Sequence, residues 1–488
     1  MMKKTLVMML ALIMSFSVFL AACGGNDDDS SNSGNSGNDG DEPYEIIWYT
    51  IGTPQKDTDK VFEHLNEYLV DKINATVKMT QIDWGDYMKK MQIKINSGEK
   101  FDIAYIAGSE YLLNARKGAF LDMGELLDQY GQETKAILDP AFLEGPLVNG
   151  TLYGLPANKE IGQQSVYLFN KSLVEKYEMD IASINSLADL DPYLAAVQQN
   201  EPDFQPMATF KPYLPFDYIL GDELPFAIRL DGDQTKIVNF YEEPETMEIL
   251  KVMHDYYDKG YLVGDAGTSD DPWPLEVENW FVRKEMYQPT AELQWARSAG
   301  YDLVMQPMHQ PITFNGSLMG SMQAISSTSE NPQKAMEFLN LLNTDPYVRA
   351  TVDKGIKGVH YEELEGGKIK DIMPARDNYR VPTYSLGNHF ILPLYENDPE
   401  NKWELFQEFN DDSIAAPTIG FYFDAENVKN EIAAIENVRG EFAKIILHGA
   451  VDPEEFIPMA TKKFEDAGMN VVMEEMQAQY TAWLAEQE

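Results

Sequence analysis

The feature that most constrains the fold is the order of strands and helices over residues 45–106. Residues 45–50 form a compact apolar run, and apolar side chains then recur at helical spacing over 61–69. An alternating strand over 76–82 and a short helix follow, and the third strand, 101–106, is almost wholly apolar. A strand without a polar face is covered on both sides, which is typical of a parallel sheet flanked by helices. The chain is therefore predicted to be an α/β protein.

The ends of these strands carry no motif for a nucleotide cofactor or a serine nucleophile. Neither GxGxxG, nor a P-loop, nor Gly-x-Ser-x-Gly follows any of them. The six histidines show no H-E-x-x-H or similar ligand spacing. Asp231-Gly232-Asp233 begins like a calcium loop but lacks the later positions, so it predicts a hairpin turn. We expect no cofactor and no metal.

The first residues of the chain have the form of an export signal that ends in a lipid-attachment site. Two lysines precede an apolar run over 6–20, which is shorter than the about 20 residues that cross a bilayer. The run closes in Leu20-Ala21-Ala22-Cys23, which resembles a bacterial lipobox, and Cys23 is the only cysteine. We expect residues 1–22 to be a cleaved signal peptide and Cys23 to carry fatty acyl chains such as palmitate. The alternative is an ordinary signal peptide followed by a chance cysteine.

The segment after Cys23 predicts a tether rather than a folded element. Residues 24–43 hold only Gly, Asn, Asp, Ser, Glu and Pro, and twenty such residues span ~25 Å as a random coil. Residues 23–43 are therefore expected to be a lipid-anchored flexible linker. The long linker and the lipid together favour a location on the extracellular face of a Gram-positive cell membrane. The alternative is a periplasmic lipoprotein.

The charge of the chain excludes several kinds of partner. Loss of Lys3 and Lys4 with the signal peptide takes the formal net charge from −42 to −44. Such a field repels nucleic acid and anionic membrane, and it disfavours a polyanionic ligand. Contact with the membrane is therefore expected through the lipid alone, and we expect no nucleic-acid partner.

Beyond residue 152 the pattern changes to shorter strands, Pro-rich turns and longer helices. Strands are predicted over 153–156 and 165–170, joined by a polar loop. Asn331-Pro332 begins a helix with apolar spacing. Residues 418–488 are predicted to be helical apart from breaks at 449–453 and at Gly468.

As a set, these stretches resemble the extracellular solute-binding proteins of ABC importers, in the oligosaccharide-binding class that includes maltose-binding protein. The C-terminal block is similar to a helical module of one lipoprotein subgroup. The segments that carry the resemblance are Leu20–Cys23, Trp48–Gly52, Gly98–Ile103, Leu152–Pro156, Asn331–Phe338 and, in the C-terminal block, 448–455, 467–468 and 477–483.

The resemblance implies a two-lobed periplasmic-binding-protein fold, in which each lobe is a mostly parallel sheet flanked by helices. Two or three crossing strands would join the lobes, with the ligand in the cleft between them. The first lobe is expected over 44–156 and 310–365, and the second over 157–309 and 366–488, including the C-terminal module. The implied function is that of a monomeric receptor, not an enzyme, which captures a neutral oligosaccharide and delivers it to an ABC permease.

Two strand ends of the first lobe are candidate ligand-binding loops. Ligands of open α/β sheets bind beyond the carboxyl ends of strands, where backbone N–H groups and helix N-termini are accessible. The glycines there could also serve only to make turns. The candidates are Gly52, Thr53 and Gln55 after the first strand, and Ser109 and Glu110 after the third.

A sugar presents apolar C–H faces ringed by hydroxyl groups, so its site needs flat aromatic side chains beside amides and carboxylates. Most aromatic residues of the chain must be core, and Trp280 and Trp295 are expected there. Tyr287 aligns with a position where relatives place a stacking aromatic residue, and Tyr422 lies where the last lobe of maltose-binding protein returns to the cleft. The candidates in polar, turn-rich contexts are Trp84 with Tyr87 at the rim, Asn158 and Glu160 at the lobe crossing, Tyr287 with Gln288, and Phe421 with Tyr422.

Two other functions are left open by the residues themselves. The 80 carboxylates could supply the acid pair of a surface glycoside hydrolase, although no spacing singles out such a pair. A peptide-binding receptor or sensor would share the same lobes, and it would differ in which ligand stabilises the protein.

Overall fold

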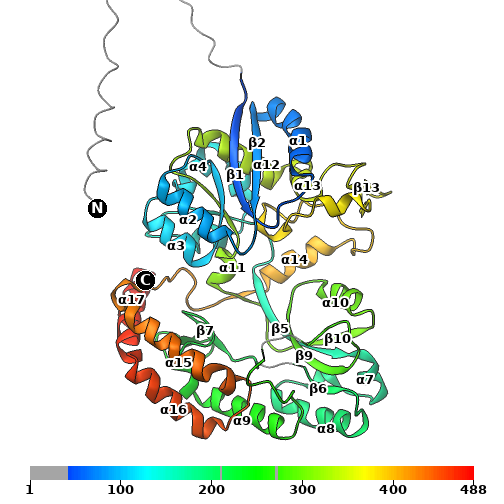
Figure 1. The fold of residues 1–488 in the computed structure, drawn as a ribbon, viewed down its shortest axis with the longest axis vertical. Coiled ribbons are helices and arrows are strands. Elements are labelled where there is room, and N and C mark those ends of the chain that lie inside the picture. Colours follow the sequence, from blue (N-terminus) through cyan, green and yellow to red (C-terminus); the bar gives the residue numbers. More distant parts are fainter. Residues whose placement is uncertain (1–41, 209–210, 270–272, 488) are drawn as a thin grey trace, which may run out of the picture. The chain divides into compact units, whose positions relative to one another are not determined.

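The computed structural model describes residues 42–208, 211–269 and 273–487. Cys23, the expected signal peptide and most of the expected linker lie outside these ranges. Pro43–Glu488 forms one compact unit, within which strands and helices gather into two lobes (Figure 1). Within the described ranges, none of the helices combines the length and the apolar character needed to cross a membrane.

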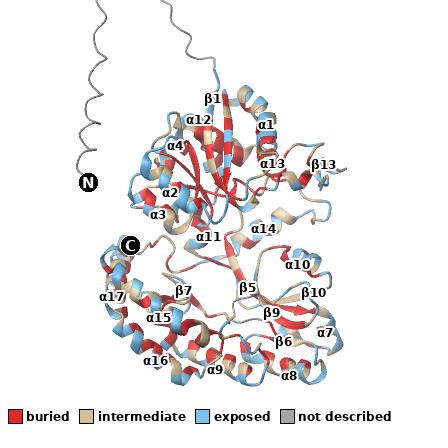
Figure 2. Cartoon of the chain, in the orientation of Figure 1, coloured by how far each residue is buried: buried red, intermediate tan, exposed pale blue. Residues whose placement is uncertain are grey.

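The sheet of the first lobe has the parallel centre that the sequence predicts. β1 pairs in parallel with β2 and β3, whereas β12 is antiparallel to both β3 and β4. All four residues of β3 are buried, as expected for a strand covered on both faces, and Figure 2 shows buried residues gathered in the sheet of this lobe. The strand order is β2 (Ala75–Ile82), β1 (Tyr44–Ile51), β3 (Ile103–Ile106), β12 (Met322–Ile325) and β4 (Leu155–Pro156).

Helices cover this sheet and close its core around a buried tryptophan. Trp48 is fully buried, and its ring meets Phe62 and Phe338 edge-on at 6.4 and 5.6 Å. The helix predicted from Asn331-Pro332 is confirmed, because the Asn331 side chain accepts a hydrogen bond from the N–H of Lys334. The helices are α1 (Thr58–Ile73), α2 (Tyr87–Ser97), α3 (Gly108–Arg116), α4 (Met123–Tyr130), α5 (Gln132–Ile137), α6 (Pro140–Glu144), α11 (Asn315–Met319), α12 (Pro332–Thr344) and α13 (Pro346–Lys354).

The segment after α13 also packs with the first lobe. It forms the β13–β14 hairpin (Tyr361–Glu363 and Ile369–Asp371) and two 3₁₀ turns (Ala375–Asn378 and Thr383–Ser385). Tyr379, Val381 and Leu386 belong to the same core as Trp48. The division into lobes remains a prediction, and this packing favours a boundary beyond residue 386 over the expected one at 365.

Three segments cross between the lobes and are hydrogen-bonded to one another. β5 (Gly162–Asn170) begins at the crossing and runs into the second lobe (Figure 1). Its first two residues pair with β11 (Ile312–Thr313), and β11 pairs with β15 (Ile414–Ala415), which follows α14 (Lys402–Asp411). The crossing is therefore a narrow ribbon, which suits rotation of one lobe relative to the other.

The sheet of the second lobe differs from the mostly parallel sheet expected. β5 is antiparallel to β9 (Trp280–Tyr287), β10 (Leu303–Pro307) and β11, and only the β6–β9 and β11–β15 pairs are parallel. The reason is connectivity, because β9 and β10 lead the chain back toward the crossing. The strand β6 is Gln205–Met207, and the helices of this lobe are α7 (Lys171–Lys176), α8 (Asp191–Asn200), α9 (Pro244–Asp258) and α10 (Ala291–Ala299), with 3₁₀ turns at Ile181–Ser183, Leu187–Leu190 and Phe240–Glu242.

The C-terminal module packs on a small β-hairpin of the second lobe. Its helices share one core with the β7–β8 pair (Phe216–Tyr218 and Ala227–Arg229). The turn predicted at Asp231-Gly232 is confirmed, since Gly232 has φ +83° between the bridged residues Ala227 and Val238. The helices are α15 (Lys429–Leu447), α16 (Pro453–Asp466) and α17 (Met469–Gln487), preceded by a 3₁₀ turn at Glu426–Val428.

The prediction of helix from residue 418 is wrong for the first stretch. Residues 418–425 are an irregular loop. Asn315 of α11 forms hydrogen bonds with backbone groups that would otherwise pair within a helix. Its amide donates to the carbonyl oxygens of Thr418 and Phe421 at 2.5 and 3.0 Å. Its Oδ1 accepts from the N–H of Gly420 at 2.9 Å. A side chain distant in sequence thus replaces the local ladder.

Candidate functional site

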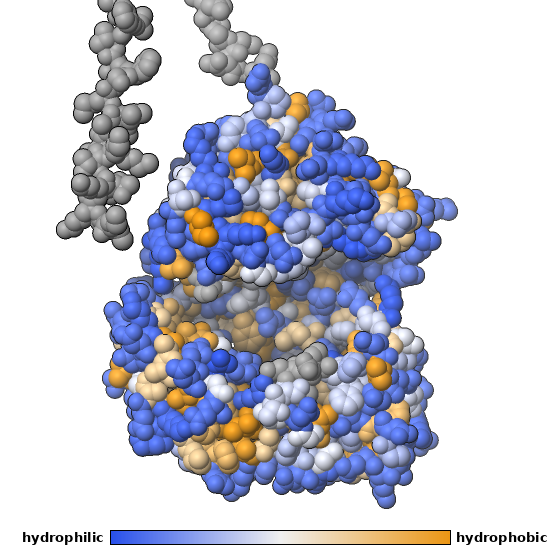
Figure 3. All heavy atoms as spheres, in the orientation of Figure 1, coloured by the Kyte–Doolittle hydropathy of each residue, from blue (hydrophilic) through white to orange (hydrophobic). Residues whose placement is uncertain are grey.

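A large cavity lies in the cleft between the lobes. It has a volume of about 690 Å³, within the ~300–1,000 Å³ of small-molecule sites. Figure 3 shows the hollow between the lobes, with apolar side chains inside it. The first lobe contributes α3 and α11, and the second contributes β5, β7, β9 and the loops at 211–215 and 418–425. We call this space the aromatic cavity.

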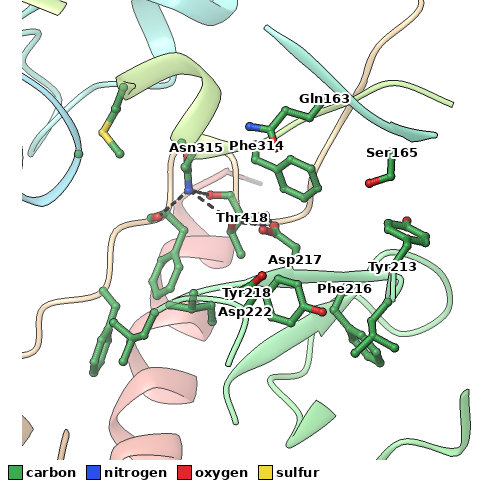
Figure 4. A pocket seen from close by; sticks show the side chains of 18 of the residues that line it. Gln163, Ser165, Tyr213, Phe216, Asp217, Tyr218, Asp222, Phe314, Asn315 and Thr418 are labelled. Atoms are coloured by element: carbon green, nitrogen blue, oxygen red, sulfur yellow. Dashed lines mark hydrogen bonds between the residues drawn. The ribbon is translucent and has the colours of Figure 1, made fainter. Parts of the chain in front are cut away.

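Flat aromatic side chains form the wall on the side of the second lobe (Figure 4). Tyr213 lies between two prolines in the loop before β7, and its ring stacks on that of His309, with 4.3 Å between the ring centroids and 20° between the ring planes. Phe216 and Tyr218 share one face of β7 because strand side chains alternate. Phe314 faces them from the start of α11. Burial raises the pKa of Tyr213 to about 12, so its hydroxyl group stays protonated.

A polar network crosses the cavity floor from one lobe to the other. The N–H and hydroxyl groups of Thr418 donate to Asp217 at 2.9 and 2.7 Å, while Asn315 holds the Thr418 carbonyl from the opposite side. Asp217 is buried, and this burial raises its pKa although the two hydrogen bonds oppose the rise. The network fixes the 418–425 loop against both α11 and β7.

His309 is neutral in this arrangement. The backbone N–H of Ser165 donates to Nε2 at 3.0 Å, so Nε2 carries no proton. The proton therefore sits on Nδ1, which donates to the carbonyl oxygen of Gln310 at 2.6 Å. Burial lowers the pKa of His309, which agrees with the neutral form. The ring thus supports Tyr213 without adding a charge.

Lys284 is a half-buried cation that lines the aromatic cavity. It lies on β9 and donates to the carbonyl oxygen of Pro212 at 3.2 Å. Burial, with repulsion from Lys211, lowers its pKa to about 8. Lys211 is itself paired with Asp222 at 2.7 Å. A half-buried ammonium group beside aromatic rings can donate to ligand hydroxyl or carbonyl oxygens.

Replacing Lys284 by methionine is expected to stabilise the protein at neutral pH by about 2 kcal/mol, because the folded state penalises the charged amine. The folded pKa lies below the ordinary 10.5, so the stability of the natural protein rises as the pH rises from about 8 toward 10.5. The variant lacks that rise. Urea unfolding of both proteins at neutral and alkaline pH measures the difference, and parallel pH profiles would show that the amine is solvated.

Two smaller chambers continue from the aromatic cavity along the cleft. The central chamber, of about 310 Å³, is lined by the start of β5, the end of β9 and α11. The outer chamber, of about 400 Å³, lies between α10 of the second lobe and the 383–406 segment with α14. Among the described residues, no group of His, Cys, Asp and Glu is arranged to hold a metal ion.

The structure places five of the predicted residues at these three spaces. Tyr287, Gln288 and Glu160 line the central chamber, and Tyr422 and Phe421 line the aromatic cavity. Phe421 is nevertheless only 5% exposed and packs on Tyr480 and Trp483 of α17. The hydroxyl group of Tyr422 donates to the carbonyl oxygen of Gly145, so it also joins the two lobes. Whether these side chains bind ligand stays a prediction.

Trp84 and its expected companion at the rim have different environments. Trp84 is 46% exposed and stacks on Tyr384, with 6.2 Å between the ring centroids. Tyr87 is fully buried and donates to the carbonyl oxygen of Tyr105 at 2.7 Å, so it supports the sheet. Trp280 is fully buried, as expected, and Trp295 is half-buried against Tyr287.

The remaining predicted residues make structural contacts in the first lobe. Gly52 has φ +140° and approaches Pro382 so closely that a Cβ atom would lie 3.0 Å from the proline ring. Gln55 accepts from the N–H of Arg380 at 2.9 Å and donates to the carbonyl oxygen of Thr53 at 2.7 Å. The backbone of Asn158 bonds to Gly387 and His389.

At the end of β3 it is Gly108, rather than the predicted Ser109 or Glu110, that lines the aromatic cavity. Glu110 lines a narrow space beside Tyr87 and Met91. Ser109 lies in the first turn of α3, and its side chain is outside the described part of the chain.

Sequence reasoning missed four aromatic residues that line the cavity, Tyr213, Phe216, Tyr218 and Phe314, together with Lys284 and His309. Lys211-Pro212-Tyr213-Leu214-Pro215-Phe216 is an aromatic, turn-rich segment of the kind that selected Tyr287. The same criterion would have found Tyr213. Nothing local marks Phe314 or His309, whose role depends on partners far away in the sequence.

Comparison with known proteins gives matches over almost the whole chain. Residues 63–357 match the family of bacterial extracellular solute-binding proteins, and residues 417–485 match a domain of unknown function (DUF3502). A carbohydrate ABC transporter substrate-binding protein of Streptococcus pneumoniae serotype 4 is 34% identical over 485 residues, which cover 97% of each chain.

Solved structures of the N-glycan transport solute binding protein of Streptococcus pneumoniae are similar to this chain at 34% identity. One of them has a TM-score of 0.84 and covers 91% of this chain and 100% of that one. The complexes with Man5GlcNAc and Man1GlcNAc have TM-scores of 0.69 and 0.72, covering 91% and 90% of this chain and 99% of each complex chain.

Proposed function

This chain belongs to the family of bacterial extracellular solute-binding proteins, and on that premise we propose that it captures a neutral oligosaccharide for an ABC importer. The family consists of binding proteins rather than enzymes, so the chain is a receptor and not a glycoside hydrolase. The 34% identical relative is named for carbohydrate transport. The receptor acts as a monomer that delivers its ligand to a permease.

The observation that carries the proposal is the aromatic cavity between the lobes. Tyr213, Tyr218 and Phe314 offer flat apolar faces to sugar C–H groups, and Lys284 and Gln163 offer hydrogen bonds to hydroxyl groups. Lys211 is paired with a carboxylate, and the whole chain carries a net charge of −42. This balance favours a neutral sugar over a polyanionic one.

The comparisons also support closure of the lobes on the ligand. The TM-score between this chain and the same relative is 0.84 for one structure, but 0.69 and 0.72 for its two glycan complexes. The sequence identity is 34% in all three comparisons. The sequence is constant in these comparisons, so the difference in score is a difference in conformation. We infer that the structure described here is an open form, and that contacts of one ligand with both lobes stabilise a closed form.

Binding of Man5GlcNAc, which the relative binds, is the first test of this function. Isothermal titration calorimetry should give saturable binding, and small-angle scattering should show a smaller radius of gyration at saturation because hinge closure buries the cleft. A panel of neutral oligosaccharides and peptides extends the test. Stabilisation by a peptide and by no sugar would favour the receptor or sensor for peptides, and an unchanged radius of gyration at saturation would count against closure.

We further propose that the protein is a lipoprotein, anchored outside the cell by Cys23. The support is the lipobox Leu20-Ala21-Ala22-Cys23 after an apolar segment, together with the absence of any other cysteine from the sequence. Two acyl chains on Cys23 anchor a protein stably, whereas one chain binds a membrane only marginally. The 24–43 linker would then hold the receptor near the permease of a Gram-positive surface.

Replacing Cys23 by alanine is expected to release the folded protein into the medium, because none of the helices in the described residues could hold it in the membrane without the lipid. Cell fractionation and immunoblotting compare the variant with the natural protein, and Ser30→Ala in the linker is the matched control. A variant that stays with the membrane after a high-salt wash would contradict lipid anchoring.

A further inference from the structure

The three spaces in the cleft form one continuous groove. The aromatic cavity and the central chamber share Gln163, Met286 and Gly316 as walls. The central and outer chambers share Glu160, Gln288 and Tyr384. In Figure 1, α3 and β7 lie to one side of β5 and α10 to the other, and the hollow in Figure 3 extends across between the lobes. A ligand longer than one cavity can therefore follow the cleft past the crossing strands.

The outer chamber has an aromatic wall that is already fixed in position. Tyr384 is 39% exposed, and Trp84 stacks beside its ring. Its backbone is held by Ser321, whose hydroxyl group donates to the Tyr384 carbonyl oxygen at 2.8 Å. Arg349 donates to the neighbouring Thr383 carbonyl oxygen at 3.2 Å. A platform fixed in this way loses little conformational entropy when a ligand stacks on it.

The opposite wall presents polar side chains that have no partner within the described ranges. Gln288, in the turn before α10, and Gln294 and Arg297, on the exposed face of α10, line the outer chamber and make no side-chain hydrogen bond or ion pair with a described residue. The two lysines that line the chamber, in contrast, already have carboxylate partners. Lys354 is paired with Asp353 at 2.8 Å, and Lys402 is paired with Asp398 at 3.0 Å. Amide and guanidinium groups facing an aromatic ring are what a sugar residue requires.

We propose that the outer chamber is a distal subsite, which binds one sugar residue of a long or branched oligosaccharide while the aromatic cavity binds another. This inference rests on the proposed function and narrows its substrate class to glycans that span the whole groove. Short glycans fill the aromatic cavity alone. Affinity thus rises with glycan length because the additional residues reach Tyr384 and the polar face of α10.

The test compares Man1GlcNAc with Man5GlcNAc, and with further short and long neutral glycans, by calorimetry. Tyr384→Ala should raise the Kd for the long glycan about tenfold, the loss of one aromatic contact, and change the Kd for the short glycan less than about twofold. Tyr384→Phe keeps the ring and should restore most of the affinity. The Gln294→Ala, Arg297→Ala double variant should weaken the long glycan selectively and leave the fold intact, since both side chains are exposed.

Ser298→Ala on α10 is the matched control, because Ser298 is exposed and does not line the chamber. Equal effects of the variants on short and long glycans, or no effect on either, would overturn the distal subsite while leaving carbohydrate binding intact. Failure of the natural protein to bind any glycan of the panel would instead overturn the proposed function.

Discussion

Replacing Asp353 by alanine is expected to lower the free energy of unfolding by about 3–5 kcal/mol, the range for breaking a buried ion pair by removing one partner. Asp353 and Arg349 are both fully buried on α13, with 3.0 Å between their charged groups. Lys354 binds the other carboxylate oxygen at 2.8 Å. Burial alone would raise the pKa of Asp353, but the two cations outweigh it and hold the pKa below its ordinary value. The alanine variant leaves both cations without their anion.

The loss of Asp353 should also loosen the segment that carries Tyr384 at the outer chamber, because Asp353 and Arg349 hold that segment in place. Thr383 donates to Asp353 at 3.2 Å, and Arg349 donates to the carbonyl oxygens of Thr383 and Asn388. Loss of the carboxylate should therefore increase hydrogen exchange over 382–389, the segment that carries Tyr384.

Asp377→Ala is the matched control for Asp353→Ala. Asp377 pairs with Arg380 at 3.2 Å on the surface, where an ion pair contributes about 0–1 kcal/mol. Denaturant unfolding of the two variants separates the cases. A loss of less than about 1 kcal/mol for both would show that the buried network does not stabilise the first lobe.

Replacing Tyr213 by alanine should weaken oligosaccharide binding by about 1–3 kcal/mol, about 5- to 150-fold in Kd. Tyr213 stacks on His309 at the wall of the aromatic cavity, and its hydroxyl group makes no hydrogen bond to a described residue. We therefore expect the flat face of the Tyr213 ring, rather than its hydroxyl group, to contact a sugar ring. Calorimetric titration with the glycan that binds the natural protein measures the effect.

Tyr193→Ala controls for the loss of any half-buried tyrosine, because Tyr193 lies on α8, distant from the cleft (Figure 1). Both variants should lose some stability, and only Tyr213→Ala should lose affinity in the folded fraction. Unchanged affinity of Tyr213→Ala would show that the ring only fills space beside His309. Tyr287 and Tyr422, which the sequence predicts as ligand-binding residues, can be tested in the same series. Tyr422→Ala is expected to lower stability as well, because the Tyr422 hydroxyl group donates to the Gly145 carbonyl oxygen.

The parts of the fold that sequence predicted are those governed by local pattern. The apolar run 101–106 became the buried β3, and Asn331-Pro332 began α12 with a side-chain cap. Both signals lie within a few residues of the structure they predict. The prediction of helix at 418–425 was wrong because the structure there depends on a distant residue. Asn315, more than one hundred positions earlier, binds the backbone of this stretch.

The α/β class could be predicted from residue patterns, and short motif segments carried the resemblance to solute-binding proteins that the comparisons confirm, because both kinds of signal are properties of neighbouring positions. The position of the aromatic wall, by contrast, depends on how distant segments pack together. Tyr213, Phe314 and Thr418 come from three distant segments, and no local pattern indicates that they lie together. They meet because β5, β11 and β15 cross side by side and bring α11 against β7. Long-range strand pairing and packing set that meeting point, and neither leaves a local signal in the chain.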